Sequence, residues 1–167
     1  MLDIHIISHN RKQGEEFLKK TTEFLNTLCV INLTYPDFSN PKIFSHFIRI
    51  FYQDQKLRIK LKPINIKVKI CLECDNLEDF RILFSDINEG LILIDTTKKD
   101  ILDKIKEEYK KSGKNNEIYF FKANTIKEKT LILIYFISEI FKILPSQNIL
   151  EPENFKEKFL IQKLYNQ

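Results

Sequence analysis

The chain has 167 residues, 43% of them hydrophobic and 30% charged, with a formal net charge of +4 at pH 7. This balance predicts one globular domain with a buried core and excludes a disordered chain. The sequence shows no apolar segment of about 20 residues and no signal-peptide layout, so we expect no membrane insertion, and the small net charge argues against nucleic acid as a partner. Three cysteines, an odd number, favour a reducing, cytoplasmic location without disulfides.

The chain begins with a pattern typical of a strand, a polar turn and a helix. Residues 2–7 are apolar except for Asp3 and His5, which predicts a first, central strand. Residues 8–16 are polar, and the apolar stripe of a helix follows. The residues of that stripe are Phe17, Leu18, Thr21, Phe24, Leu25 and Leu28. A later short apolar run and proline-rich turn occupy residues 29–41, and residues 46–52 are typical of a strand or a helical turn.

A phosphate-binding loop of the form GxxxxGK[ST] would belong between this first strand and helix. Aligned on Gly14, the chain has His9 in place of the first glycine, Glu15 in place of the lysine and Glu16 in place of the serine or threonine. Two carboxylates at a helix N-terminus suit the helix dipole but would repel a phosphate chain. We therefore expect a capped helix start at this position and no nucleotide loop.

Residues 56–69 alternate between apolar and basic side chains. Because the alternation is interrupted at Pro63, the pattern predicts a β-hairpin with one apolar and one basic face. The basic face comprises Lys56, Arg58, Lys60, Lys62, Lys67 and Lys69. One interpretation is a solvated edge hairpin guarded by lysines; the other, which we adopt, is a docking face for an acidic protein surface.

Residues 66–97 are typical of a βαβ unit in a parallel sheet. A strand with a period of two is followed by Asp75 or Asn76, either of which could cap a helix, and then by apolar residues at helical spacing. Those apolar residues are Leu77, Phe80, Phe84 and Ile87. Gly90 would end the helix, and the run 91–94 is apolar throughout, as in a strand buried on both faces.

This stretch resembles a Ras-like small GTPase from its third to its fourth strand. Residues 73–78 stand at the family's DTAGQE motif, residues 79–81 at the "RFR" helix start, and residues 93–95 at the "VYD" strand. The resemblance implies a three-layer α/β fold whose sheet is mostly parallel, with one antiparallel hairpin edge, and which is one strand–helix unit short of the family's fold. It also implies that the hydrolytic chemistry is lost.

Three positions carry that loss. Glu73 stands where the family has an aspartate that supports magnesium, Asn76 replaces the glycine that contacts the γ-phosphate, and Leu77 replaces the glutamine that orients water. The family's NKxD guanine-reading motif would fall on residues 121–124 or on residues 97–100. In a third register, residues 123–125 stand at the family's SAK loop, and no motif is intact in any of the three. The degenerate nucleotide positions are His9, Gly14, Glu15, Glu16, Glu73, Asn76 and Leu77.

Cys71 and Cys74 form a CxxC pair where a strand is predicted to lead into a helix. This is the layout of a thioredoxin-like redox pair and also half of a zinc site. Because there is no second CxxC and no paired histidines, we interpret them as structural cysteines. The redox or metal reading remains the alternative.

The last third of the chain predicts two helices, a strand between them and an appended segment. Residues 98–112 are typical of a solvated helix ended by Gly113, and residues 117–123 of a strand. Residues 126–144 predict a buried helix, with a strand over 130–137 as the alternative. We assign residues 1–145 to the domain and 146–167 to a linker and an amphipathic helix over 153–165, which folds back on the domain or docks on another protein.

Taken together, these patterns predict a non-catalytic, small-GTPase-like interaction or structural subunit of a larger assembly. We expect no enzymatic activity, no cofactor and no metal. The partner would be a protein with an acidic surface, bound by the basic hairpin, with the C-terminal helix as a second docking site. The alternatives are the thiol-redox or metal-binding protein built on Cys71 and Cys74, and a divergent protein that truly binds guanine nucleotide.

Overall fold

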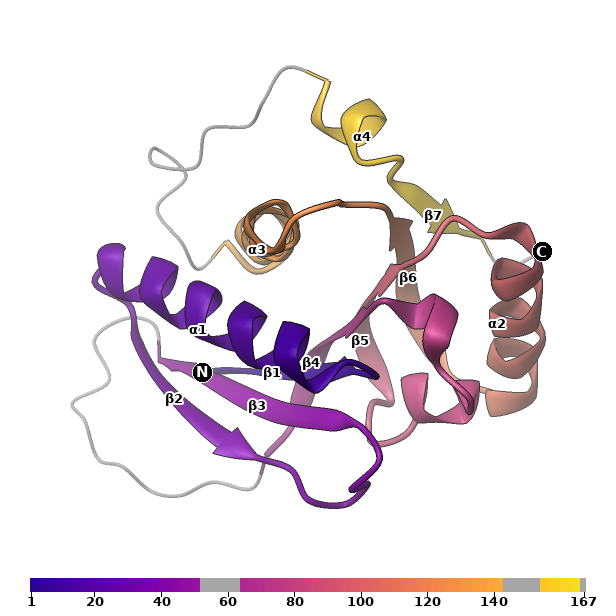
Figure 1. Cartoon of the computed structure of the whole chain (residues 1–167), viewed down its shortest axis with the longest axis horizontal. Coiled ribbons are helices and arrows are strands. Elements are labelled where there is room, and N and C mark those ends of the chain that lie inside the picture. The colour runs from indigo at the N-terminus through magenta and orange to yellow at the C-terminus, as the bar shows by residue number, and fades with distance from the viewer. Residues whose placement is uncertain (52–63, 143–153, 166–167) are drawn as a thin grey trace.

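A computed structural model describes residues 1–51, 64–142 and 154–165. It places seven strands in a single sheet, in the order β2-β3-β1-β4-β5-β6-β7 (Figure 1). The strands are β1 (Leu2–Ser8), β2 (Ile31–Pro36), β3 (Phe44–Phe51), β4 (Ile66–Leu72), β5 (Glu89–Asp95), β6 (Asn115–Phe121) and β7 (Gln162–Leu164). The helices are α1 (Arg11–Thr27), α2 (Lys99–Ser112), α3 (Ile126–Phe136) and α4 (Phe155–Lys158), with shorter turns η1 (Cys74–Asn76), η2 (Phe80–Leu83) and η3 (Ile137–Phe141).

The centre of the sheet is parallel and its edges are antiparallel. β1 pairs with β4, β4 with β5, and β5 with β6, all in parallel. β3 lies antiparallel to β1, β2 to β3, and β7 to β6. This confirms the predicted α/β fold with a mostly parallel sheet and an antiparallel hairpin edge.

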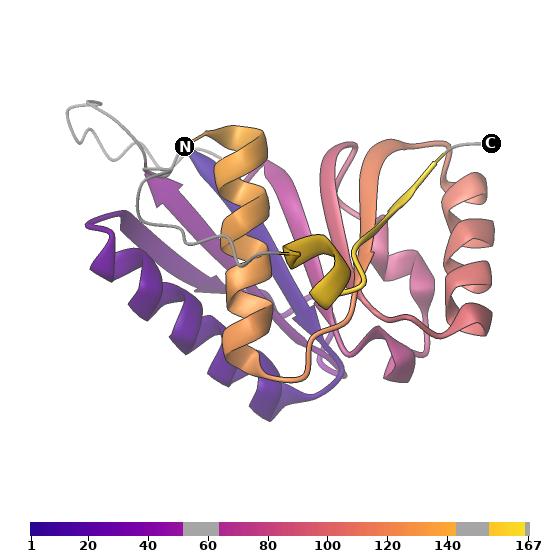
Figure 2. The ribbon, with the colours of Figure 1, turned by 90° about the horizontal axis from the view of Figure 1, so that it is seen from above.

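Helices cover both faces of the sheet. α1, α3 and α4 pack on the face that carries Ile4, Ile70 and Leu93, while η1, η2 and α2 pack on the face that carries Ile92 and Ile118 (Figure 2). Side chains on neighbouring positions of a strand point to opposite faces, so a strand covered on both sides is apolar throughout. The run 91–94 in β5 is completely buried in this way, as its sequence predicts.

Several predicted elements are confirmed. The first strand is central, between β3 and β4. The helix over 98–112 is α2, and it ends at Gly113, whose φ of 64° lies in the left-handed region. The buried helix over 126–144 is α3 followed by η3; it begins with a capping box between Thr125 and Glu128.

The helix predicted after β4 is wrong. The segment consists of two short 3₁₀ turns, η1 and η2, separated by extended backbone at Leu77. Leu77, Phe84 and Ile87 are nevertheless buried beneath it. Gly90 does not end a helix but lies inside β5 with φ of 150°, where a Cβ would come within 2.4 Å of the Lys67 carbonyl oxygen. The apolar spacing therefore correctly indicated which residues are buried, although they do not form a helix. Gly90 is required because β4 and β5 approach each other closely at this point.

The predicted hairpin over 56–69 is also wrong in its second arm. That arm is β4, whose two sides are occupied by β1 and β5 in parallel, so no antiparallel partner can pair with it. The first arm, with Lys56, Arg58, Lys60 and Lys62, lies outside the described residues. The antiparallel edge hairpin is formed by β2 and β3 instead.

The predicted amphipathic helix over 153–165 is only the single turn α4, followed by β7. Phe155 and Phe159 are buried, and the Phe155 ring lies 4.4 Å from that of Tyr135 on α3. The segment therefore folds back on the domain. None of the helices in the described ranges is long and apolar enough to cross a membrane.

Candidate functional site

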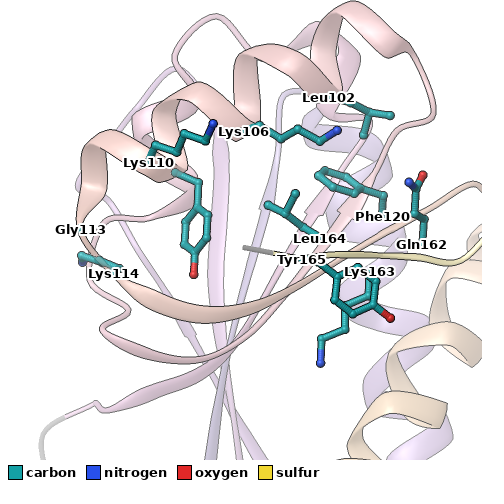
Figure 3. A pocket seen from close by; sticks show the side chains of 11 residues that line it. Leu102, Lys106, Lys110, Gly113, Lys114, Phe120, Gln162, Lys163, Leu164 and Tyr165 are labelled. Carbon is teal, nitrogen blue, oxygen red and sulfur yellow. The ribbon is translucent and has the colours of Figure 1, made fainter. Parts of the chain in front are cut away.

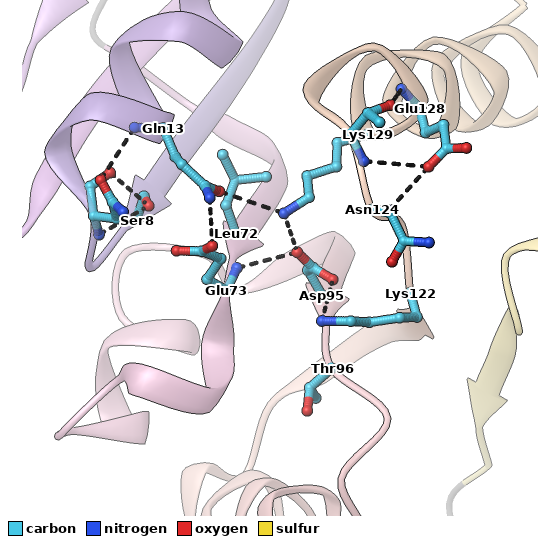
Figure 4. A network of polar contacts seen from close by, with 12 residues as sticks. Ser8, Gln13, Leu72, Glu73, Asp95, Thr96, Lys122, Asn124, Glu128 and Lys129 are labelled. Atoms are coloured by element: carbon cyan, nitrogen blue, oxygen red, sulfur yellow. Dashed lines mark hydrogen bonds and ion pairs between the residues drawn. The ribbon is translucent and has the colours of Figure 1, made fainter.

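The candidate site lies where the parallel strands β1, β4, β5 and β6 end. The chain leaves β1 for α1 on one face and leaves β4 for η1 on the other face, so the ends of these two strands form a switch point in the topology. In open α/β sheets, ligands bind in the crevice outside the carboxyl ends of the strands at such a point. The polar groups gathered at this edge therefore form the candidate functional site (Figure 4).

A buried ion pair occupies the centre of this edge. Asp95, the last residue of β5, is completely buried, and Lys129 of α3 is 4% exposed; the Lys129 Nζ lies 2.7 Å from the Asp95 Oδ2. The backbone N–H of Glu73 donates to the same oxygen at 3.2 Å. The other oxygen, Oδ1, has Lys122 Nζ at 3.7 Å and no hydrogen bond. The carboxylate thus holds together the ends of β4, β5 and β6 and the start of α3.

A second link connects this ion pair to α1. Gln13, in the first turn of α1, donates its Nε2 to Glu73 Oε1 at 2.5 Å, and its Oε1 lies 3.5 Å from Lys129 Nζ. The turn that precedes α1 is closed by its own side chains, since Asn10 caps the helix by accepting from the Gln13 N–H, and Ser8 bonds to the Asn10 backbone. The N–H groups of Asn10 and Gln13 are consequently used within the turn.

These contacts pair the polar groups at this edge with one another. A phosphate cradle needs free backbone N–H groups and a lysine directed at the phosphates. Here the buried lysine is paired with Asp95, and the α1 N-terminus is capped by Asn10. The arrangement ties four elements together and commits to Asp95 the buried lysine that a phosphate cradle would need.

The structure separates the seven positions assigned to a degenerate nucleotide site. His9 and Asn76 are exposed, whereas Leu77 is buried in the core. Glu15 and Glu16 are exposed in the second turn of α1, not at its N-terminus as predicted, and Glu15 pairs with Arg11. Only Glu73 lies in the polar network.

Gly14 has a packing role. A Cβ on this residue would come within 2.2 Å of the Phe44 ring, so the absence of a side chain lets α1 lie against β3. Its match to a phosphate-loop glycine therefore has a structural explanation.

Cys71 and Cys74 are both buried and are not joined by a disulfide. The hydrogen bond to Cys74 and complete burial raise the pKa of the Cys71 thiol well above its usual range. A redox nucleophile needs the opposite shift, since the thiolate is the reactive form. No group of three or more potential ligands among His, Cys, Asp and Glu could hold a metal ion within the described ranges.

Lys69 was predicted on the solvated basic face, and this placement is wrong. It has no exposed surface, and its Nζ donates to the carbonyl oxygens of Ile82 at 3.0 Å and Ser85 at 2.5 Å. Lys67 is half-buried on the same strand. The alternation of lysine and apolar residues in β4 marks the two faces of a central strand, both covered. A partner-binding role for the remaining basic residues stays a prediction.

A polar cluster that the sequence analysis did not predict lies on the same face of the sheet as Lys69, at β1 and β3. Ser45 Oγ is 2.6 Å from His5 Nε2 and donates to Asp37 Oδ2 at 2.6 Å. Burial, assisted by the positive charge of Lys69, lowers the pKa of His5 to about 3. Because the Ser45 hydroxyl donates to Asp37, it accepts from the Nε2–H of neutral His5, whereas the serine of a catalytic triad donates to its histidine. The cluster holds the neutral imidazole in place.

Next to it, Asp3 and Arg49 form a second buried ion pair. Arg49 Nε and Nη2 donate to the two Asp3 oxygens at 2.7 and 2.9 Å. Asp3 and His5, two polar residues in an otherwise apolar strand, were the sequence signal for both clusters. Their partners on β3 are 40 and 46 residues away and could not be identified from the sequence.

One edge of the sheet exposes apolar side chains. β2 is the edge strand, and on it Ile31 is 51% and Leu33 39% exposed. Phe38, in the turn between β2 and β3, is 84% exposed. Edge strands in monomeric proteins are usually protected by charged residues or bulges. β2 (INLTYP) has no charged residue and pairs with β3 without a bulge, and only Pro36 at its end removes a backbone donor.

Comparisons with known proteins bear on the fold. No protein-family model matches the chain, and a search of curated proteins gave no match. Among solved structures, the PorC subunit of pyruvate oxidoreductase from Thermotoga maritima is similar, with a TM-score of 0.51 over 93% of this chain and 89% of that chain. The sequence identity is 15%, so the similarity concerns the fold.

The resemblance to Ras-like small GTPases is therefore wrong. The structural match is to PorC, and the helix that carried the resemblance after β4 is absent. The physical reason is that the order strand, helix, strand recurs in many α/β folds, so pattern order alone does not identify a family.

Proposed function

We propose that this chain is a non-catalytic subunit of a multi-protein assembly, held to its partner through the β2 edge. The observation that carries the proposal is the apolar, uncharged surface of β2, with Ile31 and Leu33 exposed on an edge strand among the described residues. An exposed apolar strand edge offers both backbone hydrogen bonds and side-chain contacts to a partner.

Two further observations support it. At the carboxyl edge, where a sheet of this kind would place a substrate, Lys129 is paired with Asp95 and Gln13 is hydrogen-bonded to Glu73. The PorC protein of similar fold is itself a subunit of pyruvate oxidoreductase. A scaffold of this shape is thus compatible with a role inside a complex.

The experiment is to express the tagged chain in its source cells and measure the mass of the species that contains it by native mass spectrometry. We expect a mass well above the 20.0 kDa of the single chain. The double variant Ile31→Lys, Leu33→Lys should be recovered as the free chain, because two buried, unpaired charges disfavour an apolar contact.

Thr34→Lys is the matched control, because Thr34 is exposed on the same strand with its side chain on the opposite face. It should leave the assembly intact. Recovery of the wild-type chain at 20.0 kDa, or an unchanged assembly with the double variant, would contradict the proposal.

A further inference from the structure

A pocket lies between α2, β6 and β7, away from the carboxyl-edge network (Figure 3). Its volume is about 450 Å³. This falls within the roughly 300–1,000 Å³ of small-molecule sites in proteins. The lining is apolar at its centre, with Leu102 of α2, Phe120 of β6 and Leu164 of β7, and the Tyr109 side chain forms part of the wall.

The pocket is completed by the segment that was predicted to be a C-terminal helix. β7 pairs with β6 through Leu164 and Ile118, which fixes Leu164 opposite α2. The Tyr109 hydroxyl is engaged by the Asn116 backbone, donating to its oxygen at 3.0 Å and accepting from its N–H at 2.9 Å. The wall is thus held in place by hydrogen bonds.

Three lysines surround the apolar centre. Lys106 and Lys110 follow Leu102 at intervals of four residues, so they share one ridge of α2, and Lys114 comes just after its end. None of the three forms an ion pair with a carboxylate in the described parts of the chain. Lys163, also on the lining, is different, because its Nζ lies 3.2 Å from Glu117 Oε2.

We infer that this pocket binds a small amphipathic anion, with an apolar ring or short chain against Phe120 and Leu164 and a carboxylate or phosphate at Lys106 and Lys110. The apolar centre accounts for the body of the ligand through the hydrophobic effect. The unpaired ammonium groups account for its charge, because an anion at the rim would gain charge-assisted hydrogen bonds. In Figure 3 the Lys106 and Leu102 side chains face Phe120 and Leu164 across the pocket.

The test uses three ligands with the same ring and different charge: indole-3-acetate, indole and tryptamine. Binding to the full chain is followed by amide chemical shifts in two-dimensional NMR. We expect indole-3-acetate to bind with a Kd of about 1 mM or tighter, as its size allows. The perturbed amides should be those around Leu102, Gly113 and Leu164. Tryptamine should bind at least tenfold more weakly, roughly the effect of losing two partly exposed ion pairs.

Two variants separate charge from shape. Lys106→Gln with Lys110→Gln should weaken indole-3-acetate about tenfold and leave indole unchanged. Lys99→Gln with Lys104→Gln, on exposed positions of α2 that do not line the pocket, is the control of equal net charge and should have no effect. Leu102→Trp fills the pocket from a half-buried position and should abolish binding of both ligands.

Three outcomes would overturn the inference. They are equal affinity for tryptamine and indole-3-acetate, equal effects of the two lysine pairs, and shifts confined to other parts of the chain. Failure to detect indole-3-acetate binding up to about 10 mM would overturn it as well. None of these results bears on the β2 surface, so the inference and the proposed subunit role can fail independently.

Discussion

The two buried lysines in the described part of the chain have their charges stabilised in different ways. Lys129, on α3, is paired with the carboxylate of Asp95 at 2.7 Å. Lys69, on β4, has no carboxylate at ion-pair distance among the described residues, and its Nζ is held by the carbonyl oxygens of Ile82 and Ser85. Lys69 belongs to the central strand β4 and Lys129 to α3. Their side chains lie over opposite faces of the sheet.

The difference shows how burial and the chemical nature of the partner together set the pKa of a buried lysine. Carbonyl dipoles stabilise an ammonium less than a carboxylate does, so burial dominates at Lys69 and lowers its pKa to about 8. Asp86 raises this pKa but does not reverse the shift. Lys129 and Asp95 are instead mutually dependent, since removing either leaves a buried charge without its partner.

Lys129→Met is expected to destabilise the fold by about 3–5 kcal/mol, the usual result of leaving one half of a buried ion pair unpaired. Chemical unfolding monitored by circular dichroism measures the change. Lys127→Met, at an exposed position of the same helix, is the control and should change stability by no more than about 0.5 kcal/mol. The double variant Lys129→Met, Asp95→Asn should recover part of the loss, because the remaining group is neutral. A loss equal to that of Lys127→Met would show that the pair contributes nothing.

Lys69 should make stability depend on alkaline pH. Its pKa is about 8 in the folded protein and 10.5 in an unfolded chain, so between these values the unfolded chain binds more protons. Stability must then rise with pH across this window, by up to about 3 kcal/mol in total. Lys69→Met should remove that rise. Unfolding curves at several pH values from 7.5 to 10.5 test this, and parallel pH profiles for the wild type and the variant would contradict it.

Gln13→Ala should have the smallest effect, about 1 kcal/mol, because it removes one partly buried hydrogen bond to Glu73 and a weak contact with Lys129. For a chain of this size the melting temperature would fall by about 2–4 °C. Thermal unfolding is the measurement. In the Lys129→Met background the effect should shrink, because the network is already broken; full additivity of the two changes would indicate that Gln13 acts separately.

Periodicity predicted much of the fold correctly. β1, β5, α2 and α3 were located because each has a long, regular apolar pattern or a clear terminal signal such as Gly113. β4 was located as well, but its lysines were predicted to be exposed, whereas Lys69 is buried and Lys67 is half-buried. A lysine tail long enough to reach two carbonyl oxygens can be buried, and nothing in an alternating pattern distinguishes it from a solvated one.

The candidate site was much harder to predict. Asp95 and Lys129 are 34 residues apart in the sequence, and neither segment indicates which residue its charge would pair with. In retrospect the signal was Lys129 itself, one turn into a strongly apolar helix. The Ras-like resemblance failed for a related reason, because it relied on the helix after β4, and the apolar spacing there is satisfied equally well by two short turns.

The central position of β1 has a consequence for how the chain folds. Its partners are β3, about 40 residues away, and β4, about 60 residues away, whereas β5 and β6 pair across 26 residues with α2 between them. Because closing a longer loop costs more entropy, the shorter-range pairings of β2 with β3, β4 with β5 and β5 with β6 can form before β1 is enclosed. Until β4 pairs with it, the apolar strand β1 has no partner on the side that β4 occupies in the native sheet. The most buried strand of the native protein is therefore the one most exposed to competing associations during folding.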